Sequence, residues 1–269
     1  MEDILVSSWN ELNERLYEES WSERLGRFRS NFAFRGMQDS AFDLTTSLVR
    51  LGGDYPSHED DLLRNFRKYA HHKAAMGDSM WNWLALAQHH GLPTRLLDWT
   101  YSPYVAMHFA TADIELFGID GVIGCVDYVK VKQMLPGRLR EILDEEDTNV
   151  FTAEMLSQAA NTLREIDGLS KDDFVIFLEP PSLDDRIINQ YALFSLMSSP
   201  KARLDKWLEE RPELFRRVII PSALKWEVRD KLDQANITER VLFPGLEGLS
   251  SWLKRYYSPR TRGSRDDRL

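Results

Sequence analysis

Runs of apolar residues, separated by amphipathic helical patterns, constrain the fold of this chain more than any other feature. Four such runs occur, at residues 121–128, 174–178, 191–197 and 218–220. Their nearly continuous apolar character is typical of strands that are buried on both faces. Because helices are expected between them, the chain is predicted to mix helices and strands rather than to be all-β.

Local signals indicate where individual elements begin and end. Ser7-Ser8 precedes apolar residues at helical spacing, and Ser102-Pro103 is a typical N-cap followed by a proline in the first helical position. Gly91 is predicted to end the helix before it. We therefore predict helices over residues 7–20, 59–76, 80–90, 104–112 and 223–234, a last helix near 249–256, and short strands over 31–36 and 95–99.

The chain carries no internal repeat, low-complexity tract or Gly/Ser linker in its body. This favours one domain over residues 25–257, preceded by an N-terminal helix within residues 1–24. The end of the chain is rich in arginine and poor in large apolar residues. Residues 258–269 are therefore predicted to be a disordered tail.

Composition limits the partners and the compartment. The formal net charge is −9, so general nucleic-acid binding is disfavoured unless a local basic patch outweighs the mean charge. The single cysteine, Cys125, cannot form an internal disulfide and stands in an apolar run typical of a core. The first residues are acidic where a signal peptide would be basic, and no apolar run reaches the roughly 18 residues that span a bilayer. A cytoplasmic protein without membrane contact is expected.

Polar side chains are densest in residues 88–100, at a predicted junction of helix and turn, where functional residues often gather. Neighbouring histidines lie about 100° apart on a helix, so His89 and His90 cannot face one metal ion, and no metal site is expected. His90 is a candidate for proton transfer or substrate binding, with a structural role at the helix end as the alternative. Arg95 and Asp98 are three residues apart on a predicted strand and should point to opposite faces.

Two arginines in apolar surroundings, Arg35 and Arg186, form the second group of candidates. A buried guanidinium requires an anion. That anion is either a protein carboxylate such as Asp98, Asp184 or Glu247, or a ligand phosphate bound through two hydrogen bonds. The chain has no Rossmann, P-loop or α/β-hydrolase motif, so those enzyme classes are not expected.

Several motifs together resemble the FRG domain. They are Phe34-Arg35-Gly36, Thr45-Thr46-Ser47-Leu48-Val49-Arg50, the string Gln88-His89-His90-Gly91-Leu92-Pro93-Thr94-Arg95-Leu96-Leu97-Asp98-Trp99-Thr100, Arg186-Ile187-Ile188-Asn189-Gln190 with Phe194, and residues 242–249. The long central string is the most specific of them, and the likeness covers roughly residues 25–255. Met37 replaces the glutamine that the family usually has after Phe-Arg-Gly, and Ala192 replaces its glycine, which weakens the comparison at those two positions.

The order of three features is also similar to that of ADP-ribosyltransferases. These enzymes place an arginine at the end of an early strand, a short polar strand motif before a helix, and a Glu or Gln on a later strand. Arg35, Asp98-Trp99-Thr100 and Gln190 occur here in that order. The resemblance implies that Arg35 holds a phosphate of NAD while polar groups stabilise the positively charged sugar that forms as nicotinamide leaves. Because Gln190 carries no charge, Asp98 or Glu247 would supply the carboxylate.

The expected fold is α+β, a single domain with a mixed, mainly antiparallel central sheet flanked by helices, similar to ADP-ribosyltransferases. The expected function is that of a nucleotide-handling effector of bacterial stress or phage defence, with NAD as substrate and an unidentified macromolecular acceptor. The alternatives are a non-catalytic module that binds a nucleotide, nucleic acid or protein, and a buried polar network that only fixes the fold. The catalytic candidates are Arg35, His90, Asp98 and Gln190, and the ligand-binding candidates are Gly36, Arg95, Thr100, Arg186 and Glu247.

Overall fold

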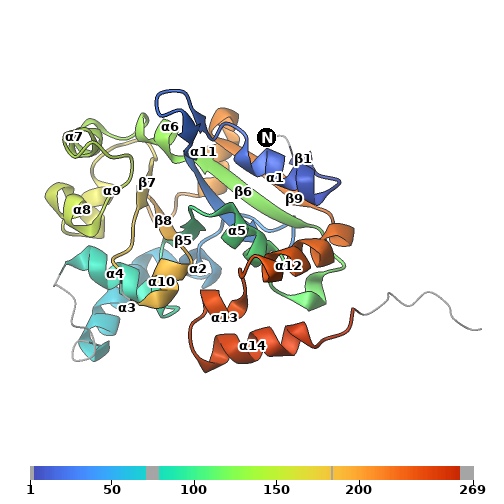
Figure 1. Ribbon diagram of the computed structural model, residues 1–269. Coiled ribbons are helices and arrows are strands. Elements are labelled where there is room, and N and C mark those ends of the chain that lie inside the picture. The colour runs from blue at the N-terminus through green and yellow to red at the C-terminus, as the bar shows by residue number, and fades with distance from the viewer. Residues whose placement is uncertain (1–2, 71–78, 183, 261–269) are drawn as a thin grey trace, which may run out of the picture.

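A seven-stranded sheet forms the centre of the protein in a computed structural model that describes residues 3–70, 79–182 and 184–260 (Figure 1). The strand order is β1-β9-β6-β4-β5-β8-β7, and every neighbouring pair is antiparallel except β1 with β9. The strands are β1 (Asp3–Leu5), β4 (Phe32–Met37), β5 (Leu96–Thr100), β6 (Gly121–Asp127), β7 (Val175–Leu178), β8 (Ala192–Met197) and β9 (Phe215–Ile220). A separate hairpin pairs β2 (Trp21–Ser22) with β3 (Arg27–Phe28). The prediction of a mixed, mainly antiparallel sheet is confirmed.

Two groups of helices cover one face of this sheet and lie toward its opposite ends (Figure 1). The first group packs over β4, β6 and β9 and consists of α1 (Trp9–Tyr17), α5 (Pro103–Ala110) and α12 (Lys225–Gln234). The second group packs over β5, β7 and β8 and consists of α3 (Tyr55–Ala70), α4 (Met80–His89), α7 (Gly137–Glu145), α8 (Ala153–Ala159) and α9 (Leu163–Asp167). The opposite face is covered by α6 (Tyr128–Lys132) and α11 (Leu204–Glu209).

The register of the central strands decides which side chains lie between the two helix groups. Phe34 pairs with Thr100, and Asp98 pairs with Phe194. Directly paired residues, and residues two apart on a strand, share a face of the sheet. All four side chains therefore lie on the face that carries the two helix groups.

Gly36 allows α5 to approach β4 closely. A Cβ atom at this position would lie 1.8 Å from the carbonyl oxygen of Ala106 and 2.7 Å from the amide nitrogen of Ala110. Because neither backbone atom can move without shifting the helix, only glycine fits. The glycine of the Phe-Arg-Gly motif thus sets the position of α5 above the sheet.

The capping signals predicted from the sequence are confirmed. The Ser8 and Ser102 side chains accept the Glu11 and Val105 amides at the starts of α1 and α5. Gly91 ends α4 with a φ of 79°, the left-handed conformation that glycine adopts most easily. The strands predicted at 31–36 and 95–99 are displaced by one residue, and Tyr191 lies before β8 rather than in it.

The C-terminal helices are attached through a buried charged network. They are α13 (Glu239–Leu242) and α14 (Leu246–Tyr256). Arg255 donates to Glu239 at 2.6 Å and to Asp233 at 2.6 Å, and Arg229 donates to the Nδ1 atom of His108 at 2.7 Å. Burial is the main cause that lowers the pKa of His108 to about 3, so this ring is neutral. The network links α5 and α12 to both C-terminal helices.

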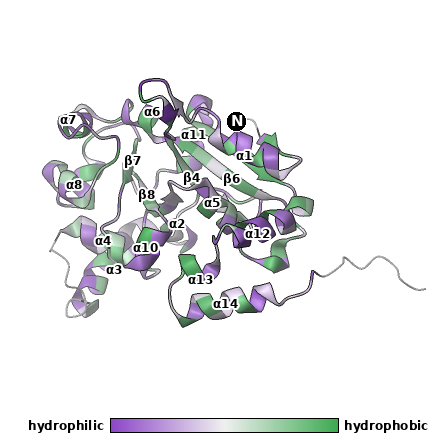
Figure 2. Cartoon of the chain, in the orientation of Figure 1, coloured by the Kyte–Doolittle hydropathy of each residue, from purple (hydrophilic) through white to green (hydrophobic). Residues whose placement is uncertain are grey.

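The hydropathy of the residues agrees with their positions in the sheet and helices. Figure 2 shows apolar residues along β6 and β7, whereas α12 is largely hydrophilic. Cys125 is fully buried in β6, and burial raises the pKa of its thiol to about 12, as expected for a core residue. Among the described residues, no helix is long and apolar enough to cross a membrane. The predicted helical residues 71–76 and tail residues 261–269 lie outside the described residues.

Candidate functional site

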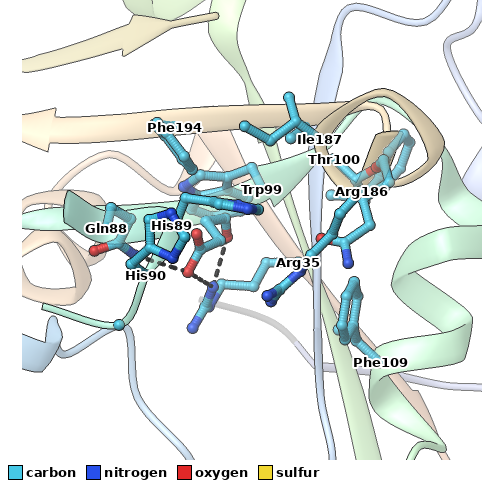
Figure 3. A pocket seen from close by; sticks show the side chains of 16 residues that line it. Arg35, Gln88, His89, His90, Trp99, Thr100, Phe109, Arg186, Ile187 and Phe194 are labelled. Carbon is cyan, nitrogen blue, oxygen red and sulfur yellow. Dashed lines mark hydrogen bonds and ion pairs between the residues drawn. The ribbon is translucent and has the colours of Figure 1, made fainter. Parts of the chain in front are cut away.

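A cavity of about 620 Å³ opens between the two helix groups, above β4, β5 and β8 (Figure 3). It is lined mainly by polar and aromatic side chains from three helices, α4, α5 and α10, and from the middle of the sheet. The lining residues are Phe34, Arg35, Gly36, Gln88, His89, His90, Gly91, Asp98, Trp99, Thr100, Phe109, Arg186, Ile187, Gln190, Ala192 and Phe194. Seven of the nine candidates named from the sequence are among them: Arg35, Gly36, His90, Asp98, Thr100, Arg186 and Gln190.

Arg35 spans an opening between β4 and β5. The pair Phe34–Thr100 is the single register pair that joins these two described strands, so they separate beyond it. The Nη1 atom of Arg35 donates to the backbone oxygen of Asp98 at 2.5 Å and lies 3.9 Å from its carboxylate. Burial lowers the pKa of Arg35, and the nearby carboxylate opposes this. The side chain remains 23% exposed, so part of the guanidinium faces the cavity.

Asp98 is held in place and yet open to the cavity. Its Oδ2 atom accepts a hydrogen bond from the Gln88 amide at 3.0 Å, and Gln88 in turn accepts from the Thr94 hydroxyl at 2.6 Å. The Asp98 side chain is 59% exposed. A carboxylate that is oriented by its neighbours but accessible is suited to act on a bound ligand.

His89 and Asp184 connect two walls of the cavity. The Nε2 atom of His89 lies 2.7 Å from Oδ2 of Asp184, whose Oδ1 accepts the amides of Arg186 and Ile187 at the start of α10 (Asp185–Asn189). Burial raises the pKa of Asp184, but the Ile187 amide and His89 lower it by more, so the pKa lies below its ordinary value. This carboxylate is therefore an anion that joins α4 to α10.

His90 lies beside this pair. Its ring is 5.2 Å from that of His89 and nearly perpendicular to it. Among the described residues, neither ring nitrogen of His90 has a hydrogen-bond partner, although both it and His89 line the cavity. The imidazole of His90 is therefore available to form a hydrogen bond with a bound molecule.

Arg186 provides a second cation. Its guanidinium lies 5.0 Å from the centre of the Phe243 ring. No described acidic side chain forms an ion pair with it, although Asp184 and Asp185 are its neighbours in the chain. The expected protein carboxylate is thus absent for Arg186 within the described residues, and its charge is available to an anion in the cavity.

Thr100 and Gln190 hold the cavity wall together. The Thr100 hydroxyl donates to the backbone oxygen of Gln190 at 2.7 Å, and the Gln190 side-chain amide donates to the Leu242 oxygen at 2.9 Å. These bonds join β5, α10 and α13. Each residue thus lines the cavity and also makes a bond that fixes the surrounding backbone.

Arg95 and Glu247 lie outside the cavity. Arg95 is only 4% exposed and binds the Glu59 carboxylate through two nitrogens and Asp167 at 2.6 Å. Glu247 is exposed in the first turn of α14. Of the two carboxylates considered from the sequence, Asp98 is therefore the one that lines the cavity.

The other nine lining residues are not among the candidates named from the sequence, and they include Gln88, His89 and Phe109. The first two belong to the same string as His90, so the string itself was the available signal. Phe109 comes from α5, and nothing in its local sequence distinguishes it from a core residue. Among the described residues, no group of three or more His, Cys, Asp and Glu side chains could hold a metal ion.

Three of the motifs contribute residues to this cavity although they are distant in sequence: Phe34-Arg35-Gly36, the central string and the Arg186 segment. The second motif, residues 45–50, forms α2 (Ser47–Arg50), whose Thr46 side chain caps the helix. The Ser47 hydroxyl accepts the Thr94 amide at 3.1 Å and so ties this motif to the long central string. Residues 30–117, which hold the Phe-Arg-Gly motif, this second motif and the central string, match the family model of the FRG domain.

The chain therefore contains an FRG domain over residues 30–117. This segment supplies Arg35, His90 and Asp98 to the cavity, whereas Arg186 and Gln190 come from beyond it. No curated protein and no solved structure shows a significant match to the chain.

Proposed function

We propose that this FRG domain protein is a cytoplasmic ADP-ribosyltransferase-like enzyme that uses NAD, and that it acts as an effector of bacterial stress or phage defence. One observation carries the enzymatic proposal: Arg35 and Arg186 line the same cavity as the accessible carboxylate of Asp98. Two guanidiniums suit the two phosphates of a dinucleotide, and the carboxylate suits a cationic sugar.

The size and the lining of the cavity agree with such a substrate. Its volume of about 620 Å³ lies within the range of small-molecule sites. Phe109 and Phe194 add aromatic surface to the polar lining. The Arg186 guanidinium is exposed and has no ion-pair partner among the described residues, and the Nε atom of Arg35 is buried without a described hydrogen-bond partner. Phosphate oxygens supply acceptors that suit both side chains.

The reaction would proceed by cleavage of a glycosidic bond. The bond between C1′ of the ribose and the nicotinamide nitrogen breaks, and its electron pair leaves with nicotinamide. The Asp98 carboxylate stabilises the positive charge that develops on the sugar, while Arg35 and Arg186 hold the diphosphate. A nucleophile of the acceptor then forms the new bond to C1′, and His90 takes the proton that this nucleophile loses.

The test is incubation of the purified protein with radiolabelled NAD, alone and with cell lysate or RNA. Transfer of label, or release of nicotinamide, is expected for the wild type. Asp98→Asn should abolish it while the melting temperature stays unchanged, because Asp98 is largely exposed. Asp185→Asn, an exposed residue beside the cavity, is the matched control and should retain activity. Activity that survives Asp98→Asn would overturn this mechanism.

A non-catalytic nucleotide-binding module is the second candidate. It is favoured by Gln190, which carries no charge and whose side-chain amide donates to the Leu242 oxygen. Calorimetric binding of NAD without nicotinamide release, in the presence of every acceptor tested, would support this module over the enzyme.

A further inference from the structure

A second cavity, of about 420 Å³, has a wall made of three tyrosines, Tyr101, Tyr128 and Tyr191. Tyr101 and Tyr128 pack against the core on the sheet face opposite the candidate site. Tyr101 directly follows Thr100, and Tyr191 directly follows Gln190. The segments Thr100-Tyr101 and Gln190-Tyr191 therefore each contribute one residue to the candidate site and one to the tyrosine cavity.

The three rings are inclined to one another. The centre of the Tyr101 ring lies 5.8 Å from that of Tyr128 at an angle of 76°, and 4.9 Å from that of Tyr191 at 57°. A nucleobase stacks on a flat, parallel ring face. These rings contact one another edge to face or at a tilt, so they form no pair of parallel faces for a base. A tyrosine face that stays open to the cavity attracts a cation instead.

A carboxylate that has no ion-pair partner among the described residues lines the same cavity. Glu179 lines the cavity and accepts a hydrogen bond from the Tyr101 hydroxyl at 2.9 Å. Within the described residues, no lysine or arginine forms an ion pair with Glu179. Arg29 also lines the cavity, but its Nη1 atom donates to the Phe28 backbone oxygen at 2.9 Å. Glu179 thus carries a negative charge that no described cationic side chain neutralises through an ion pair.

The tyrosine faces also carry no stacked cation from the described part of the chain. Elsewhere on the molecule cations cover aromatic rings, as Arg211 does at 4.4 Å from the centre of the Trp207 ring. In the described part of the chain, no Lys or Arg stacks on Tyr101, Tyr128 or Tyr191. The tyrosine faces and the Glu179 carboxylate thus have no cationic partner among the described residues, and both features recognise a cation.

The rim of the cavity is shaped for a larger partner than a free ion. Tyr191 is 59% exposed and has a φ of 48°, a left-handed conformation that is uncommon for a residue with a side chain. Phe28 lines the cavity and contacts Trp21 edge-on at 5.2 Å, and both rings are exposed. These rings offer apolar contact to the residues that flank a cationic side chain in a peptide.

We propose that the tyrosine cavity binds a guanidinium or alkylammonium side chain of a protein partner, between Tyr101, Tyr128, Tyr191 and Glu179. The proposal does not depend on the transferase activity. It concerns different side chains, and Asp98→Asn should leave it unaffected.

The experiment uses fluorescence anisotropy with labelled peptides. The first probe is Gly-Ser-Arg-Gly-Ser, the second has lysine in place of arginine, and the third has citrulline, which keeps the shape of arginine without its charge. We expect the arginine or the lysine peptide to bind at least about fivefold more tightly than the citrulline peptide. Equal binding of all three would overturn the proposal, as would tighter binding of a labelled oligouridylate.

Matched variants locate the binding. Glu179→Gln and Tyr191→Asn should each weaken the favoured peptide about fivefold or more, and asparagine tolerates the left-handed backbone at position 191. Glu213→Gln and Tyr257→Asn, exposed residues elsewhere, should have no effect. Tyr191→Phe keeps the ring and should retain binding, which separates loss of the ring from loss of the fold. If Glu179→Gln and Tyr191→Asn both bound the peptide as tightly as the wild type, the peptide would bind at another surface. This result would overturn the proposal.

Discussion

The Nε2 atom of His89 lies 2.7 Å from Oδ2 of Asp184 and so joins the last turn of α4 to the N-cap of α10. The other oxygen of Asp184 accepts the Arg186 amide at 3.0 Å. The Asp184 carboxylate therefore joins α4 to α10 and also caps the start of α10, the helix that carries Arg186. We infer that the pair positions the Arg186 guanidinium.

Removal of His89 tests this positioning without removing the helix cap. His89→Ala should weaken binding of ADP-ribose several-fold, because α10 loses its tie to α4. Asp184→Ala should weaken it further and also destabilise the protein by about 1 kcal/mol, since the cap is lost as well. Calorimetry and thermal unfolding measure the two effects, and His58→Ala, an exposed histidine of α3, is the control. Unchanged affinity in His89→Ala would contradict the positioning role.

Arg186 itself should contribute affinity but little stability. It is exposed and has no described ion-pair partner, so Arg186→Gln should leave the melting temperature nearly unchanged. Binding of ADP-ribose should weaken about tenfold or more, because a charge-assisted hydrogen bond is lost. Arg138→Gln, on the surface of α7, should bind like the wild type. If Arg186→Gln and Arg138→Gln bound ADP-ribose with equal affinity, Arg186 would not be a phosphate ligand.

Gly36→Ala should be strongly destabilising. The new Cβ atom would meet the Ala106 oxygen at 1.8 Å, so α5 has to move away from β4. A loss of about 3 kcal/mol or more is expected, at or beyond the upper end for overpacking because backbone atoms collide. Gly137→Ala is the control, since nothing lies within 4 Å of its added Cβ and it begins a helix. Urea unfolding that shows equal stability for the two variants would contradict this account.

Much of the fold follows from signals that act locally. The helix ends at Ser8, Gly91 and Ser102 depend on a few neighbouring residues, and each lies where the sequence predicts it. The strands with continuous apolar runs are likewise predictable, because burial on both faces leaves no alternation. Strand order required long-range pairing, and the sequence offered no local signal for it.

The candidate site is predictable only in part, for a physical reason. Arg35 and Arg95 are both arginines among apolar residues, and sequence alone does not distinguish a guanidinium that faces a cavity from one that is neutralised inside the core. The difference lies in Glu59, which is 36 residues from Arg95 and has no local pattern that marks it as its partner. Glu247 likewise resembled a site residue by its motif, but α14 carries it to the surface.

Arg95 is therefore expected to act on stability. It and Glu59 are both almost fully buried, so Arg95→Gln leaves a buried carboxylate without its cation. Loss of one partner of such a pair costs about 3–5 kcal/mol. Urea unfolding should show this loss for Arg95→Gln and not for Arg164→Gln, whose ion pair with Asp60 is exposed. If Arg95→Gln were as stable as the wild type, the structural role would be contradicted and a ligand-binding role for Arg95 would have to be tested.

Glu239 should make the stability of the protein depend on pH in the acid range. Burial disfavours its charge, but Arg255 and Arg229 stabilise the carboxylate by more, and the pKa falls from 4.5 to about 2. The unfolded chain then takes up a proton at a higher pH than the folded protein does. The stabilisation is thus fully present above pH 4.5 and is lost as the pH falls toward 2.

The size of this effect is about 3 kcal/mol, because one pKa unit corresponds to about 1.4 kcal/mol. Glu239→Gln removes the titrating group and leaves Arg255 with Asp233 as its remaining acidic partner. The variant should be less stable than the wild type at pH 6, and the difference in unfolding free energy should narrow as the pH falls toward 2. Urea unfolding at several pH values measures the difference, with Glu213→Gln as the exposed control. A difference that stays constant from pH 6 to pH 2 would show that Glu239 does not titrate between the two states, and that its contacts with the arginines do not produce the acid sensitivity.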